Sequence, residues 1–218
     1  MAAVVAWWKV VGPGFGWLSA AVTALFGATG WAVGGGWLAA LGTIAAASGL
    51  LFARRPRPAA GALGGAALLY AGASLGDGGI IGTLTGAALL GGVTGEMLLG
   101  HWYLIDPGLP RWALKRLAGF GAVGMVVDAG WVVTGAGWKD EVIGWAFVAL
   151  AATTLLLMAG VWFSLNEPSY PGVMAATGLS YLAILTAIGA AVAGRALLDE
   201  GTSLLSGAGA AFGTIPLL

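Results

Sequence analysis

Long apolar runs separated by short polar segments dominate the pattern of this chain. No charged residue occurs from Gly14 to Phe52, and the later runs are separated by small clusters of charged residues, proline and glycine. A helix that crosses the hydrocarbon of a bilayer needs about 20 mainly apolar residues. Only helices or closed barrels satisfy the backbone there, and these runs are too long and too poorly alternating for barrel strands. The pattern therefore predicts an all-α bundle of membrane-spanning helices.

The boundaries of the runs predict about seven spans. The first run is too long for one span, and the glycines of Gly30–Trp37 offer a turn that divides it into two helices. Six spans would result if this run were a single helix. The other five predicted spans are Ala59–Ser74, Gly78–Tyr103, Trp112–Val133, Val142–Leu165 and Gly172–Arg195. We expect residues 1–200 to form one transmembrane helical domain, followed by a glycine-rich tail over 201–218 that lies at the interface.

Composition supports the membrane class. Of 218 residues, 59% are hydrophobic and only 8% are charged, whereas a soluble domain carries about 25% charged residues. We therefore expect a multi-pass integral protein of a prokaryotic plasma membrane, with the lipid bilayer as its main surrounding. The net charge of zero gives no overall field that would attract nucleic acid. The absence of cysteine excludes disulfides and thiolate metal sites.

The lysines and arginines predict an orientation. With alternating loops, only Lys139 and Arg195 lie on one side, and seven cationic residues lie on the other: Lys9, Arg54, Arg55, Arg57, Arg111, Lys115 and Arg116. This bias places the N-terminus inside and the C-terminus outside, with the last six of these residues as cytoplasmic anchors. In the segment Ala53–Pro58 we expect the prolines to stop helix on both sides. Its arginines either report topology alone or contact anionic lipid or a partner.

Glycine stripes mark the third and fourth spans. At about 100° per residue, each stripe falls on one narrow helix face. The stripes include Gly61, Gly65, Gly72 and Gly76 in the third span, and Gly82 and Gly86 in the fourth. Small residues allow helices to approach closely in lipid, so these two helices are predicted to pack against each other. The alternative is that a stripe packs against another subunit.

Two acidic residues fall inside predicted spans. Glu96 lies beside the glycine stripe of its helix, and Asp128 shares a face with Gly121 and Gly124, so both should point into the bundle. Ionisable groups at this depth are costly and often mark function. They are candidate functional residues, or else neutral carboxyls hydrogen-bonded to a neighbouring helix. Glu96 is expected near the cytoplasmic third and Asp128 near the opposite face, so a direct pair is not predicted.

His101, the only histidine, begins the segment His101–Trp112. A histidine followed by tryptophan and tyrosine at a membrane boundary is typical of an aromatic belt. The alternative is a polar pocket shared with Glu96, such as a quinone headgroup site or a proton entry. The turn Asn166–Gly172 is expected on the same side and could join this segment in one surface.

The candidate chemistry leaves three functions open. We predict no catalytic residues and no metal site, because one histidine and the scattered acids lack the spacing of metal ligands. The first interpretation is a non-enzymatic membrane subunit or scaffold, packed through glycine-striped helices in a homo-oligomer or a larger membrane complex. The second is a small-solute or proton-coupled transporter or channel that uses Glu96 and Asp128. The third is a quinone- or lipid-handling subunit of a membrane enzyme around His101. No cofactor is predicted, although a quinone or a lipid is kept as a candidate ligand.

Overall fold

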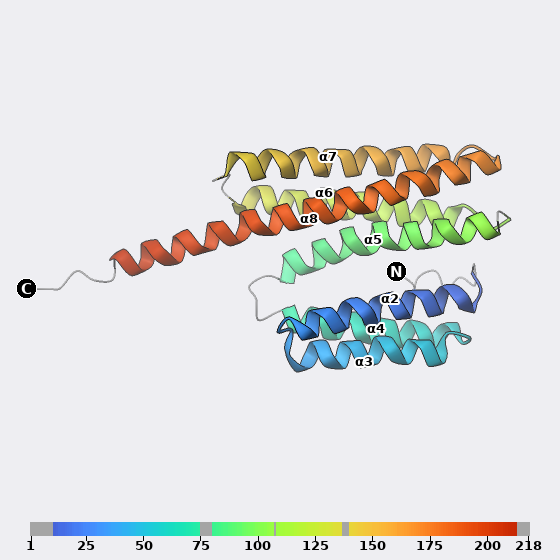
Figure 1. The fold of residues 1–218 in the computed structure, drawn as a ribbon, viewed down its shortest axis with the longest axis horizontal. Coiled ribbons are helices and arrows are strands. Elements are labelled where there is room, and N and C mark those ends of the chain that lie inside the picture. The colour runs from blue at the N-terminus through green and yellow to red at the C-terminus, as the bar shows by residue number, and fades with distance from the viewer. Residues whose placement is uncertain (1–10, 75–79, 107, 137–139, 213–218) are drawn as a thin grey trace, which may run out of the picture.

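The structure, a computed structural model, describes residues 11–74, 80–106, 108–136 and 140–212. These residues form seven helices and no strands, so the predicted all-α class is confirmed (Figure 1). The helices are α2 (Pro13–Ala32), α3 (Gly36–Phe52), α4 (Pro56–Ala73), α5 (Ile80–Ile105), α6 (Trp112–Ala136), α7 (Glu141–Ser164) and α8 (Tyr170–Phe212).

The first apolar run is divided into α2 and α3, as predicted. Gly34 in the turn between them has a φ of +111°, and Gly36, the first residue of α3, has a φ of +66°. Residues with a side chain rarely adopt these φ angles, whereas glycine adopts them easily because it has no Cβ to clash with the backbone. The glycine cluster therefore reverses the chain here and excludes a single long helix.

The segment Ala53–Pro58 differs from the prediction on one side. The turn ends at Arg55, and Pro56 is already the first residue of α4, so the prolines begin this helix instead of separating it from the loop. Proline is compatible with the first turn because the amide hydrogen it lacks would have no partner within the helix.

The last helix is longer than the predicted span. Helix α8 continues beyond Arg195 to Phe212 and contains 43 residues. At 1.5 Å per residue this is about 65 Å, roughly twice the thickness of a bilayer's hydrocarbon. Figure 1 shows its C-terminal part projecting beyond the other helices.

Four helices have the length and hydropathy of membrane spans. They correspond to Ile81–Ile105, Trp112–Gly135, Glu141–Ser164 and Tyr170–Leu198. Helix α3 is apolar but has only 17 residues. The chain is therefore a helical bundle built for a membrane, and seven spans remains an approximate number.

The helices form two groups, α2–α4 and α5–α8, which lie side by side (Figure 1). Helix α4 packs on α3 and scarcely touches α5, which packs on α6 and α8. The predicted pairing of the two glycine-striped helices is therefore wrong. Gly61 and Gly65 of α4 have no atom of another residue near the position of a Cβ, and Gly76 lies outside the described residues. A glycine stripe shows that a helix can be approached closely, but it does not specify the neighbour.

The glycines of α5 and α6 bring these two helices into close contact. A Cβ on Gly92 would lie 2.4 Å from Cα of Gly121, and one on Gly124 would lie 2.5 Å from the backbone nitrogen of Leu89. Such separations leave no room for any side chain. This contact forms the centre of the α5–α8 group, whose buried core includes Val93 and Met125.

Alternation of the helices places three loops at one end of the bundle: α3–α4, α5–α6 and α7–α8 (Figure 1). Arg54 and Arg55 belong to the first of these loops, and Arg111 belongs to the second. The predicted clustering of cationic residues at one end is thus reproduced by the helix order. Which end faces the cytoplasm stays a prediction.

Candidate functional site

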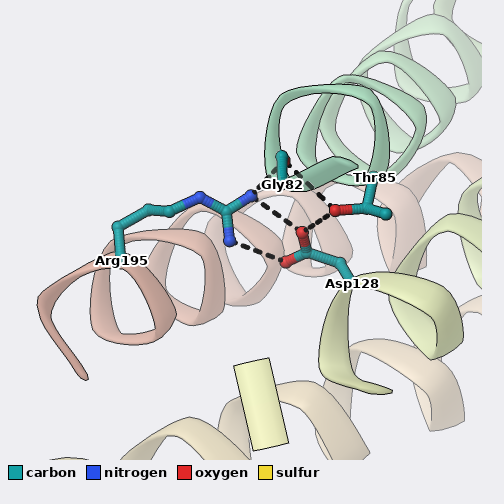
Figure 2. A network of polar contacts seen from close by, with 4 residues as sticks. All are labelled: Gly82, Thr85, Asp128 and Arg195. Atoms are coloured by element: carbon teal, nitrogen blue, oxygen red, sulfur yellow. Dashed lines mark hydrogen bonds and ion pairs between the residues drawn. The ribbon is translucent and has the colours of Figure 1, made fainter. Parts of the chain in front are cut away.

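Asp128 on α6 is the centre of a polar network inside the bundle. Its side chain is completely buried, and its Oδ1 lies 2.8 Å from Nη2 of Arg195 on α8 (Figure 2). The Thr85 hydroxyl on α5 donates to the same carboxylate oxygen at 2.6 Å. Arg195 also donates to the carbonyl oxygen of Gly82 at 2.7 Å. The network therefore joins α5, α6 and α8.

Both charges in this network are satisfied. An unpaired charge at membrane depth is costly, but a close partner and additional hydrogen bonds offset much of that cost. A glycine makes space for the cation, because a Cβ on Gly86 would lie 2.5 Å from Nη2 of Arg195. The Arg195 side chain keeps 36% of its surface exposed, whereas Asp128 has none. The arrangement holds three helices together and leaves no carboxylate oxygen of Asp128 without a partner.

Glu96 on α5 has the opposite environment. Its side chain is completely buried, and neither carboxyl oxygen has a hydrogen-bond partner. The Ser180 hydroxyl on α8 is its polar neighbour, but that hydroxyl donates to the carbonyl oxygen of Thr177 at 2.8 Å. The oxygen of Ser180 can still accept a hydrogen bond. A protonated Glu96 could supply that bond, whereas a charged Glu96 would require the Ser180 hydroxyl to turn away from Thr177.

The two acids do not meet, in agreement with the sequence prediction. The network of Asp128 touches α5 at Gly82 and Thr85. Glu96 is eleven residues further along the same helix than Thr85, which corresponds to about 16 Å. Both side chains point into the bundle as predicted, but they are separate sites with different chemistry.

His101 is exposed near the end of α5, whereas Glu96, five residues earlier on the same helix, is completely buried. Its Nδ1 lies 3.3 Å from the hydroxyl oxygen of Tyr181 on α8. The neighbouring Tyr103 is buried and donates from its hydroxyl to the carbonyl oxygen of Pro110 at 2.6 Å. These contacts fix the turn between α5 and α6 and leave the histidine at the surface of the bundle.

The cationic end of the bundle is held by contacts to the turn between α7 and α8. Arg111 donates to the carbonyl oxygens of Glu167, Pro168 and Ser169, and Lys115 donates to the side-chain oxygen of Asn166 at 2.6 Å. The predicted joining of these two segments in one surface is confirmed. Two of the proposed cytoplasmic anchors, Arg111 and Lys115, thus make hydrogen bonds within the protein.

Arg195 is the partner that the sequence prediction missed. The charge pattern alone places Arg195 on the outer side, at the end of an apolar run, and gives Asp128 no cationic partner. A usable indication was present: both residues are expected toward the outer ends of their helices, one acid and one base at similar depth. In a low-dielectric medium such opposite charges attract strongly.

No other protein guides the assignment: comparison with protein families, with curated proteins and with solved structures finds no match. Within the described residues, no three histidine, aspartate or glutamate side chains lie close enough together to hold a metal ion. The apolar helices and their buried ion pair define a multi-pass helical membrane protein.

Proposed function

We propose that the protein is a non-enzymatic membrane subunit that assembles through the outer face of α4. The single observation that carries this proposal is the division of α4 into two opposite faces. Ala59 and Ala66 are buried on the inner face, where Tyr70 packs against Gly42 of α3. The outer face carries Gly61, Gly65 and Leu68, about 180° away around the helix.

The outer face of α4 has the properties of a helix-docking surface. The space beside Gly61 and Gly65 is open, and the Leu68 side chain is 77% exposed. By contrast, Gly82, Gly86 and Gly92 of α5 all have close neighbours within the chain. Association in lipid depends on close packing, and small residues at the interface allow it.

A second copy of the chain is the partner that we propose for this face. Most homodimers have two-fold symmetry, so the same surface is used on both subunits. In such a dimer the two α4 helices lie against each other, and residues near the axis meet their own copies.

Cysteine cross-linking tests the dimer directly, because the natural chain contains no cysteine. The variant Leu68→Cys is expected to form a disulfide-linked dimer in native membranes under mild oxidation, since a disulfide requires Cβ atoms about 4 Å apart. The matched control is Leu156→Cys on α7, where the leucine is 73% exposed. Dimer bands should be strong for position 68 and weak for position 156. Equal cross-linking at both positions, or a monomer in mild detergent, would contradict the proposal.

Transport is a second candidate, and the orphaned carboxyl of Glu96 is the observation that favours it. Asp128 gives this alternative less support because its oxygens are occupied by Arg195 and Thr85. If Glu96 carries protons, Glu96→Gln should abolish proton flux into proteoliposomes, because a glutamine amide does not take up or release a proton near neutral pH. Thr94→Val on the same helix is the control and should retain flux. Flux that survives in Glu96→Gln rules out this mechanism.

A further inference from the structure

A groove runs along α2 and α4, and its two larger hollows lie between these helices and α5 of the other group. It consists of three hollows that share residues. The first, of about 250 Å³, has Arg54 in its wall and shares Phe15 and Leu63 with the second. The second and third, of about 490 and 520 Å³, share six residues: Val22, Thr23, Tyr70, Ala87, Gly91 and Thr94. Hollows of this size can hold part of a small molecule.

The lining of this groove favours a hydrocarbon chain over a polar solute. Most of it is alanine, leucine, valine, glycine and phenylalanine. Two of its hydroxyls are already used within the protein: Thr23 donates to the carbonyl oxygen of Ser19, and Tyr70 donates to Thr43. An occupant would therefore gain mainly by burying apolar surface.

The first two hollows together have the length of one leaflet. The first two hollows follow α2 from Pro13 to Thr23. Ten residues of helix measure about 15 Å, which is half of a hydrocarbon core of about 30 Å. A lipid in the leaflet at the arginine end could lay one acyl chain along them.

The end of the groove offers a site for a phosphate. Arg54 and Arg55 are both exposed, and in the part of the chain that the structure describes neither is paired with a carboxylate. They immediately precede α4, whose first turn has no side-chain cap. The first turn of α4 adds little to this charge, because Pro56 and Pro58 have no amide hydrogen to donate to an anion. Arg54 and Pro56 line the first hollow, and Arg55 lies between them in the chain.

We infer that the groove binds an anionic phospholipid, with its phosphate at Arg54 and Arg55 and one acyl chain between α2, α4 and α5. The charge of the site distinguishes this occupant from a neutral lipid or a quinone. The apolar hollows distinguish it from a free phosphate, which would use only the arginines. The inference does not depend on dimerisation through α4, because none of the residues of the proposed dimer face lines the groove.

Native mass spectrometry of the full chain from mixed phosphatidylcholine and phosphatidylglycerol vesicles tests this site. The wild type should retain phosphatidylglycerol in preference to phosphatidylcholine. Arg54→Gln should reduce that preference about fivefold, the factor expected for one cation near an anionic headgroup. Arg116→Gln removes the same charge from a residue that is not in the wall of the groove, and it should leave the preference nearly unchanged.

A second pair of variants tests the acyl chain. Ala67→Trp would fill the second hollow and should abolish lipid retention, whereas Ala152→Trp on the exposed surface of α7 should not. If the tryptophan variant fails to fold, Ala67→Leu replaces it as the test. This smaller change should weaken lipid retention. Loss of preference in Arg54→Gln with full retention in both Ala67 variants would indicate surface attraction only and overturn the groove. Equal retention of both lipids by the wild type, or a polypeptide recovered in the groove, would also overturn it.

Discussion

Replacing Arg195 with methionine is expected to lower the free energy of unfolding by about 3–5 kcal/mol. The substitution removes the guanidinium and leaves the Asp128 carboxylate completely buried with only Thr85 as a donor. Asp128→Leu should cost less, because the remaining Arg195 already has 36% of its side chain exposed and can turn toward the lipid headgroups. Unfolding in mixed micelles, followed by far-ultraviolet circular dichroism, measures both losses.

The double variant separates pairing from packing. Apolar side chains of similar volume often replace a buried ion pair with little loss. We therefore expect Asp128→Leu combined with Arg195→Met to be more stable than Arg195→Met alone. If the losses of the two single variants simply add, the ion pair does not couple α6 to α8.

Glu96 provides the contrasting control for this series. Its carboxyl oxygens have no partner, so Glu96→Met should leave stability unchanged or raise it by about 1–3 kcal/mol, the cost of an unsatisfied buried group. A large loss would show that Glu96 has a structural partner. Similar substitutions of the two buried acids are thus expected to change stability in opposite directions. In that case Asp128 stabilises the fold, whereas Glu96 does not and has another role.

The second large effect is expected at the crossing of α5 and α6. Gly124→Ala should lower stability by about 1–3 kcal/mol or more, because its Cβ would lie 2.5 Å from a backbone atom of Leu89. Backbone cannot yield as a flexible side chain does, so the two helices must separate. The same unfolding titration measures the loss, and Gly92→Ala should behave alike because its Cβ would meet the backbone of Gly121.

Gly130 is the matched control on the same helix. It is exposed, and no atom lies within 4 Å of the position of a Cβ there. Gly130→Ala should therefore be neutral or stabilising by about 0.5–1 kcal/mol, since alanine loses less backbone entropy in a helix. A similar loss for Gly124→Ala and Gly130→Ala would mean that helix propensity, not close approach, decides the outcome.

Local patterns in the sequence were sufficient for the helices and their faces. The described residues form seven helices close to the predicted spans, and Glu96 and Asp128 are both buried as the helical period indicated. The positions of the glycines at the α2–α3 turn also predicted the reversal there. These features depend on residues within a few turns of one another, so a single stretch of sequence contains the information.

The choice of neighbours was not contained in those patterns. Glycine stripes on α4 and α5 suggested a pair, yet α5 packs on α6 and α8, and Gly61 and Gly65 of α4 stay open while Gly72 meets Leu38 of α3. In lipid the hydrophobic pattern cannot decide such pairings, because every helix is apolar on most of its surface and lipid covers whatever protein does not.

The sequence by itself determined a membrane bundle of about seven helices, its inward-pointing acids and its cationic end, because composition and helical periodicity are local properties. Tertiary structure decided which polar partners each of the two buried acids has. It brings Arg195 to Asp128 across 67 positions in the chain and brings no donor to Glu96. It also forms the groove along α2 and α4, where Arg54 and the apolar walls come together. These outcomes depend on which helix faces meet, and that is set by packing over the whole bundle.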